Sequence, residues 1–195
     1  LAKGALLAGG AAAIGVAASR PGGRELDAAL FADVNAGHGA ASDRLFAGVT
    51  ELGSVFAAGA GAGVLALAGR RRAAIRAIGA AGATWLAGQA LKKLIDRPRP
   101  YEVDPEGTRL LIAEPRGTSW PSSHPAVLSA FTLTAARELG LGRMPRAALT
   151  GLDLVVATSR VYLGVHYPSD VSGGLLMGRA IAAVWPGGAA PAGRG

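Results

Sequence analysis

The chain has 195 residues, of which half are hydrophobic and 17% are charged, and its net charge is +7. One domain is expected at this length, and the composition is apolar for a soluble domain. The positive charge favours an anionic partner. Nucleic acid is the weaker candidate because aromatic residues make up only 5% and do not alternate with a basic stripe. The absence of cysteine excludes disulfides and thiolate metal sites.

The N-terminal segment, residues 1–19, continues after Lys3 as an apolar run rich in Ala and Gly. This composition suits a membrane helix, and a signal peptide with a small-residue end near Ala17 is the alternative. Because the later segments are also membrane-like, we expect a retained helix.

Residues 20–44 form a mixed segment, which Pro21 and the glycines beside it separate from the first run. Apolar side chains then recur at helical spacing on an otherwise polar stretch, at Leu26, Leu30, Phe31 and Val34. The pattern predicts a short amphipathic helix. On this segment alone, a helix at a membrane surface and a surface helix of a soluble protein are equally good interpretations.

Two long apolar stretches follow this segment. Residues 45–69 have a length close to the roughly 20 residues that a membrane-spanning helix needs, and they contain a single acid. Gly59 and Gly63 have the small-xxx-small spacing, which predicts close packing against a neighbouring helix. Residues 73–91 form the second span, which ends at a pair of lysines.

The second half of the chain alternates between loops and apolar segments. Prolines and acids mark residues 96–120 as a loop, and the Pro/Gly/Ala-rich tail over residues 186–195 is predicted to be disordered. Gly174 and Gly178 repeat the close-packing spacing in the last apolar segment. The three apolar segments between the loop and the tail are residues 124–139, 147–165 and 170–185.

These segments predict an all-α fold: a bundle of six transmembrane helices with a short amphipathic interfacial helix, in a single domain over residues 1–195. If the helices alternate in direction, the basic residues outside the motifs fall on one side, which the positive-inside rule makes cytoplasmic. They are Lys3, Arg70, Arg71, Arg72, Arg76, Arg137, Arg143 and Arg146. The sequence thus predicts an integral protein of the cell (plasma) membrane with its functional site facing outside.

Three stretches on that outer face carry ionisable side chains: residues 92–100, 121–124 and 159–170. Together they supply two histidines, an aspartate and several cations, a set suited to one anionic substrate. In the last stretch Pro168 is expected to begin a helix, and the helix dipole keeps Asp170 ionised in its first turn. Asp170 can then accept from Nδ1 of His166 and leave Nε2 free to attack.

The other two stretches are suited to binding phosphate. His124 follows Ser122 and Ser123 at a helix start, where free N–H groups bind anions. Arginine and lysine add positive charge, and arginine makes bidentate phosphate contacts. The cations are Lys92, Arg99 and Arg160. Each stretch alone has an ordinary interpretation, as a capping pair, a serine-capped helix start or a juxtamembrane basic cluster, but their conjunction on one face favours a phosphate-ester site.

The chain resembles the type 2 phosphatidic acid phosphatase superfamily in three motifs that occur in the same order. They are Lys92-x6-Arg99-Pro100, Pro121-Ser122-Ser123-His124 and Ser159-Arg160-x5-His166-x3-Asp170. This superfamily includes integral-membrane lipid phosphatases, soluble class A acid phosphatases and vanadium-dependent haloperoxidases. The motifs span residues 92–170, and the six-helix layout extends the likeness to nearly the whole chain.

The resemblance implies a mechanism without a metal or cofactor. His166 is then the nucleophile that forms a phosphohistidine, Asp170 orients His166, and His124 protonates the leaving group. The implied phosphate ligands are Lys92, Arg99, Ser122, Ser123 and Arg160. The family usually has Gly where Ser123 stands, but the N–H is retained, so phosphate binding is expected to survive. Pro125 is also uncommon in the family and fits a helix start.

We therefore expect a membrane-embedded lipid phosphatase that acts on a polyprenyl diphosphate, phosphatidic acid or a related phospholipid phosphate. No nucleic-acid partner is expected, and the sequence leaves the oligomeric state open. A soluble-type acid phosphatase or a vanadium haloperoxidase with the same pocket is the main alternative, which the apolar segments and the short chain disfavour. A non-catalytic lipid-binding membrane protein is a third, which the intact signature disfavours.

Two further charges, Asp153 and Arg179, lie in adjacent apolar segments. Unpaired charges are costly inside a membrane. We therefore predict that these two residues form an ion pair that braces the last two helices, with a structural role.

Overall fold

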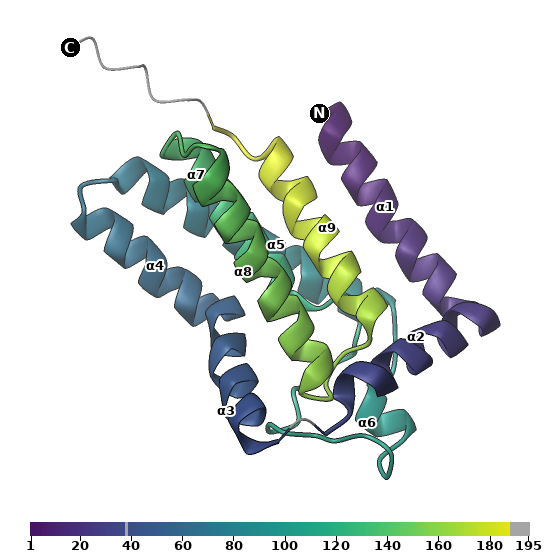
Figure 1. Cartoon of the computed structure of the whole chain (residues 1–195). Coiled ribbons are helices and arrows are strands. Elements are labelled where there is room, and N and C mark those ends of the chain that lie inside the picture. Colours follow the sequence, from purple (N-terminus) through teal and green to yellow (C-terminus); the bar gives the residue numbers. More distant parts are fainter. Residues whose placement is uncertain (38, 188–195) are drawn as a thin grey trace.

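The computed structural model describes residues 1–37 and 39–187, and within these ranges the chain is helical and contains no strand (Figure 1). The prediction of an all-α fold is confirmed. Residues 188–195 of the predicted disordered tail lie outside the described part. The elements are α1 (Ala2–Ser19), α2 (Pro21–Asn35), α3 (Ala40–Val49), the 3-10 helix η1 (Thr50–Gly53), α4 (Val55–Leu67), α5 (Arg71–Leu94), α6 (Pro100–Val103), α7 (Ser123–Glu138), α8 (Arg143–Tyr162) and α9 (Pro168–Val184).

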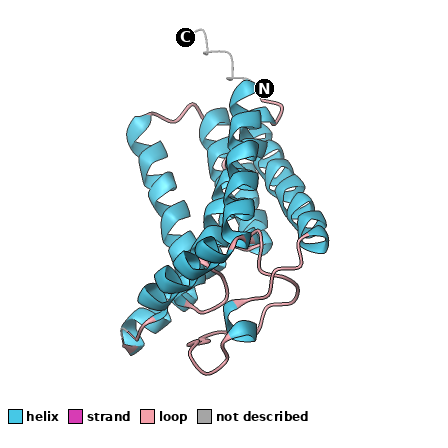
Figure 2. Ribbon diagram, turned by 90° about the vertical axis from the view of Figure 1, so that its right-hand side faces the viewer, coloured by secondary structure: helices cyan, strands magenta, loops and turns pink. Residues whose placement is uncertain are grey.

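The long helices run side by side, and α2 crosses beneath them at the lower end of the bundle (Figures 1 and 2). Helix α9 packs against α1 and α7, and α5 packs against α7 and α4. The basic stretches at residues 70–76 and 137–146 lie at the upper end in Figure 1, where α5 and α8 begin. The loop over residues 95–122 and the α8–α9 turn lie at the lower end. The motif-bearing end of the bundle is therefore opposite the basic end.

The apolar stretch over residues 45–69 is not one continuous helix, because the chain bends by 65° between α3–η1 and α4. Ser54 begins α4 as its N-cap, since the side-chain oxygen accepts from the Ala57 N–H at 3.1 Å. Gly53, just before it, lies so close to α7 that a Cβ there would stand 2.8 Å from the His124 Cβ. Among the described helices, α1 alone is long and apolar enough to cross a membrane by itself, and the bent pair passes the same test only when joined. The count of six spans stays a prediction.

The two small-xxx-small pairs behave differently in the structure. A Cβ built on Gly174 or Gly178 would overlap a backbone carbonyl oxygen of the α7 segment, that of Ser122 or Ala126. Close packing of the last helix is thus confirmed. At Gly59 and Gly63 no atom of the described chain would lie within 4 Å of such a Cβ, so this pair does not pack closely against another helix of the described chain. Helix α4 instead contacts its neighbours through another face, on which Ala58 and Ala62 are buried.

This contrast gives a prediction with a matched control. Gly178→Ala forces α9 away from α7 and is expected to destabilise the fold by about 1–3 kcal/mol. Gly59→Ala adds the same methyl group where nothing opposes it, and it gains about 0.5–1 kcal/mol of helix propensity. Thermal melting in detergent micelles should therefore show a lower Tm for Gly178→Ala and an unchanged or higher Tm for Gly59→Ala. Equal shifts in the two variants would contradict the close-packing account.

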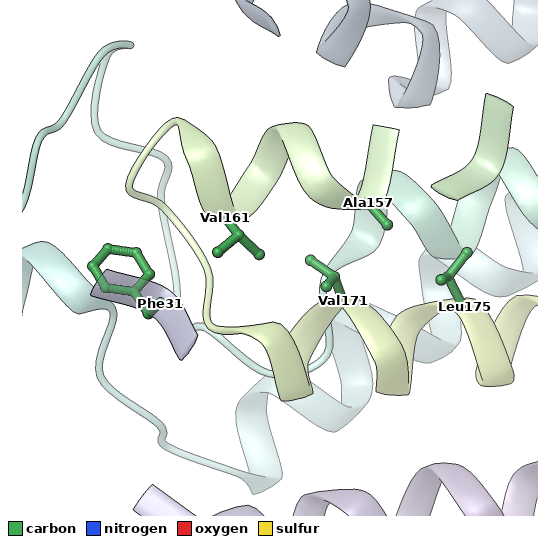
Figure 3. Packing of buried hydrophobic residues seen from close by; sticks show 5 residues of the cluster. All are labelled: Phe31, Ala157, Val161, Val171 and Leu175. Carbon is green, nitrogen blue, oxygen red and sulfur yellow. The ribbon is translucent and has the colours of Figure 1, made fainter. Parts of the chain in front are cut away.

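Helix α2 docks on the ends of α8 and α9 through one apolar cluster (Figure 3). Phe31 of α2 is buried there, whereas Leu26 and Leu30 are 61% and 45% exposed. The predicted amphipathic helix is present. The buried face of α2 joins the core beside the α8–α9 turn. The side chains of this cluster are Phe31, Ala157, Val161, Val171 and Leu175.

The predicted ion pair between Asp153 and Arg179 is wrong as a direct contact. Asp153 is fully buried, and its Oδ1 accepts from the Thr132 hydroxyl of α7 at 3.1 Å. Among the salt bridges of the described residues, none joins Asp153 to Arg179. The hydroxyl on the facing helix provides the donor that the buried carboxyl requires.

Candidate active site

The three motifs come together at the lower end of the bundle. His166 lies in the turn between α8 and α9, and Asp170 lies in the first turn of α9, which begins at Pro168 as predicted. The other predicted site residues also lie at helix ends around this turn, although they come from four other segments. Lys92 ends α5, Arg99 precedes α6, Ser122, Ser123 and His124 begin α7, and Arg160 ends α8.

The imidazole of His166 is held between an acidic and a basic neighbour. Its Nδ1 lies 3.6 Å from Asp170 Oδ2 and 3.4 Å from the Ser119 hydroxyl. On the other side, Nε2 lies 3.3 Å from a guanidinium nitrogen of Arg99. A guanidinium can only donate, so Nε2 must carry the lone pair and Nδ1 the proton. In this tautomer Nε2 is the ring nitrogen that is chemically capable of nucleophilic attack.

Electrostatics keep that imidazole neutral. Burial, followed by the positive charges of Arg99, Arg160 and Lys92, lowers the pKa of His166 well below its ordinary value. His124 acts on His166 in the same direction, so both histidines and all three cations share one electrostatic environment. A neutral His166 is available near pH 7 without any proton having to be removed.

Asp170 is fully buried and has more partners than the sequence indicated. Its Oδ2 accepts from the Ser119 hydroxyl at 2.5 Å and from the Tyr167 N–H at 2.8 Å. Its Oδ1 accepts from Arg97 at 2.6 Å. Sequence reasoning missed Ser119 altogether, since a serine before Trp120 carries no signal. It also treated Arg97 as one undifferentiated member of a basic cluster.

Arg99 and Lys92 are fixed by backbone carbonyl groups of the loop before α7 and, for Arg99, of the α8–α9 turn. Arg99 is 2% exposed and donates to the carbonyls of Gly117 and Val165, both at 2.8 Å. The Lys92 ammonium donates to the Thr118 carbonyl and, at 3.3 Å, to that of Ser119. These contacts orient both cations beside His166 and use only part of their donor capacity.

The remaining predicted phosphate ligands include buried polar atoms without a partner. Among the residues that the structure describes, the hydroxyls of Ser122 and Ser123 and the Nε of Arg160 make no hydrogen bond. Arg160 is 3% exposed, and its Nη1 donates to the Thr50 hydroxyl at 2.9 Å. The backbone N–H of Ser122 donates to the Asp170 carbonyl at 3.0 Å, so Ser122 offers its hydroxyl, not its N–H, to an anion. Unpartnered donors at the helix ends around the turn that contains His166 suit a phosphoryl group.

Two hollows border the loop before α7. One of about 310 Å³ borders Arg97, Gly117 and Thr118 on the outer side of the loop. A larger cavity of about 760 Å³ lies between α1, α2 and the end of α5, and its lining is mostly apolar, with Val16, Leu91 and Trp120 among its walls. Over the described part of the chain, no group of three or more His, Cys, Asp or Glu side chains is placed to hold a metal ion.

Comparison of the sequence with known proteins identifies a matching family and several relatives. The family model of the PAP2 superfamily matches residues 72–189. A decaprenylphosphoryl-5-phosphoribose phosphatase of Mycobacterium tuberculosis is 35% identical over 63% of this chain and 64% of that protein. An undecaprenyl-diphosphatase of Sulfolobus acidocaldarius is 36% identical over 47% of this chain and 43% of that protein. The chain thus spans less than two thirds of the length of these curated relatives.

Solved structures show the same fold. A transmembrane PAP2-type phosphatidylglycerolphosphate phosphatase from Bacillus subtilis superposes with a TM-score of 0.79 at 22% identity, covering 94% of each chain. LpxE from Aquifex aeolicus superposes with a TM-score of 0.71 at 25% identity over 82% of this chain and 93% of that one.

Proposed function

The chain belongs to the PAP2 superfamily, and from this membership and the site geometry we propose that it is a lipid phosphatase. It hydrolyses a phosphate or diphosphate monoester of a membrane lipid without a metal, through a phosphohistidine intermediate. The observation that carries the proposal is the arrangement around His166. A neutral imidazole has its Nδ1 turned to Asp170 and its Nε2 turned to Arg99, with unpartnered donors of Ser122 and Arg160 in the same cluster.

The first step is attack of His166 Nε2 on phosphorus. The N–P bond forms as the P–O bond to the lipid breaks, and His124 gives its proton to the leaving oxygen. The Nδ1–H then carries the new positive charge of the ring, which the carboxylate of Asp170 stabilises. Lys92, Arg99 and Arg160 hold the three equatorial oxygens, with the hydroxyls of Ser122 and Ser123 as further donors.

The second step returns the enzyme to its starting state. Neutral His124, having lost its proton to the lipid alcohol or phosphate, takes a proton from a water molecule. The oxygen of that water attacks phosphorus, and the N–P bond breaks to release inorganic phosphate. The site then again has a neutral His166. Burial and the charges of Arg160, Arg99 and Lys92 lower the pKa of His124, so the proton that His124 donates in the next cycle is held there by the negative charge of the bound phosphate ester.

The proposed substrate class is a polyprenyl carrier that ends in a phosphate monoester or a diphosphate. The names of the relatives from Mycobacterium tuberculosis and Sulfolobus acidocaldarius both specify polyprenyl phosphates, which supports this choice over phosphatidic acid and other phospholipid phosphates. We place the protein in the plasma membrane with its site on the outer side. The separation of the basic end of the bundle from the motif-bearing end supports that orientation.

Phosphate release in detergent micelles tests the function and its independence of metals. The panel comprises decaprenylphosphoryl-5-phosphoribose, undecaprenyl diphosphate, phosphatidic acid and a soluble sugar phosphate, each with and without EDTA. We expect release from the polyprenyl substrates at the same rate with and without chelator, and little from the sugar phosphate. Loss of activity on chelation would overturn the metal-free mechanism. Release from phosphatidic acid alone would overturn the proposed substrate class.

A further inference from the structure

We propose that Asp27 and Arg97 are positioning residues for the catalytic pair of His166 and Asp170. Arg97 holds Asp170 from behind, and Asp27 of the surface helix α2 holds Arg97. The inference rests on the proposed function for its kinetic consequences. Its structural content, the orientation of the His166 ring, can be measured without activity.

Arg97 bridges two buried carboxylates with separate nitrogens. One guanidinium nitrogen donates to Asp170 Oδ1 and the other to Asp27 Oδ2, both at 2.6 Å. The carboxylate side chains are 0% and 5% exposed, so neither is solvated by bulk water. A buried carboxylate is costly unless a cation and hydrogen bonds compensate it. Arg97 therefore maintains the charge on Asp170 that attracts the Nδ1–H of His166.

Arg97 does not face the side of Asp170 that His166 occupies. It binds Oδ1, whereas His166 Nδ1, the Ser119 hydroxyl and the Tyr167 N–H all face Oδ2. The guanidinium also lies over the Tyr167 ring, 4.6 Å from its centroid. This position distinguishes Arg97 from Arg99, which contacts the nucleophilic Nε2. Arg97 should influence turnover with little effect on substrate binding.

Asp27 also caps the catalytic helix from another segment of the chain. Its Oδ1 accepts from the Ser169 N–H at 2.9 Å, and its Oδ2 accepts from the Ser169 hydroxyl. The first N–H groups of a helix have no partner within the helix, and a negative charge is favourable beside them. Asp27 thus fixes both the first turn of α9, which contains Asp170, and the cation that holds Asp170.

The docking of α2 makes this arrangement rigid. Phe31 meets Tyr167 edge-on with ring centroids 5.5 Å apart, and Figure 3 shows Phe31 beside the α8–α9 turn. At the end of α2, the buried Asn35 donates to the Tyr162 carbonyl at 2.8 Å and accepts from the Arg109 N–H at 2.8 Å. The contacts of Phe31 and Asn35 fix α2 against the bundle and so hold the Asp27 carboxylate in place. The amphipathic helix is thereby coupled to the catalytic aspartate.

The test compares four variants of the full chain in detergent micelles: Arg97→Gln, Arg97→Lys, Asp27→Asn and the double variant Arg97→Gln/Asp27→Asn. We expect Arg97→Gln to lower kcat about 10²-fold, as expected for a misplaced catalytic group, with KM within about twofold. Asp27→Asn should lower kcat by about tenfold, and the double variant should be no slower than Arg97→Gln because both changes act through one contact. Arg97→Lys keeps the charge and should recover part of the rate.

Arg72→Gln is the matched control. Arg72 also pairs with a buried carboxylate, that of Glu138 at 3.1 Å, but at the opposite end of the bundle, and Arg76 remains as a second partner. This variant should keep the wild-type kcat. A loss of kcat equal to that of Arg97→Gln would show that breaking any such ion pair slows the enzyme, which would overturn the inference.

The tautomer of His166, read from nitrogen-15 NMR of histidine-labelled protein, gives a second readout. Wild type should show the proton on Nδ1, whereas Arg97→Gln and Asp27→Asn should show a mixture of both tautomers. An unchanged tautomer together with unchanged kcat would overturn the inference, as would a raised KM at unchanged kcat. A wild-type protein that releases no phosphate would overturn the proposed function, and the tautomer measurement would still decide the positioning role. If Arg97→Gln does not fold, Asp27→Asn decides alone.

Discussion

Replacing His166 with Ala is expected to lower kcat for lipid phosphate hydrolysis roughly 10⁴-fold or more, because the attacking nitrogen is removed. The variant should still bind inorganic phosphate, since Lys92, Arg99 and Arg160 are unaffected. Its thermal stabilisation by phosphate, compared with that of wild type, separates loss of the nucleophile from loss of the fold. Activity within tenfold of wild type would contradict the assignment of His166 as nucleophile.

The same variant tests the intermediate. Wild type quenched during turnover of a phosphorus-32-labelled substrate should carry a label that is stable in alkali and lost in acid, as expected of a phosphoramidate. His166→Ala should carry no such label. A label that persists in this variant would assign the nucleophile to another residue.

Replacing His124 with Ala is expected to lower kcat by about 10²–10⁴-fold for a substrate with a lipid alcohol as leaving group, because that oxygen then leaves without a proton. The loss should be much smaller for p-nitrophenyl phosphate, whose leaving group is stable as an anion. His124 lies at the start of α7 against Gly53, so its place is fixed by the fold. The ratio of the two losses therefore reports the acid role directly.

The second role of His124 gives an independent check. Without a base to activate water, His124→Ala should accumulate the phosphohistidine during turnover of p-nitrophenyl phosphate. A burst of p-nitrophenol followed by a slow steady state would be the result in stopped-flow measurements. Equal losses on the two substrates, with no burst, would instead indicate that His124 only supports the structure.

The motif residues could be located from the sequence because their spacing reflects local rules. Pro168 indicates a helix start. Asp170 then lies in the first turn of that helix, and His166 lies two residues before Pro168. The same logic places Ser122 at the start of α7. Hydrophobic runs indicated the helices themselves, and the family resemblance supplied the expected order of the segments.

The partners of these residues could not be derived in this way. Asp170 is held by Ser119 and Arg97, and Arg97 by Asp27, contacts that join positions 51, 73 and 70 residues apart. No local periodicity encodes which cation of a Lys/Arg cluster faces an aspartate and which faces a histidine. That choice depends on the side-chain directions that the loop before α7 imposes.

By itself, the sequence determined the helical composition, the helix ends that carry the chemistry and the identity of the phosphate-site candidates. These features follow from hydrophobic patterning and from the chemistry of single residue types. Only the tertiary structure decided that the chain bends at Ser54, that Gly178 packs closely against α7 while Gly59 packs against no described helix, and that Asp27 of α2 pairs with the arginine that holds Asp170. Each of these depends on which surface of one helix meets another, and helix packing across the whole chain sets that contact.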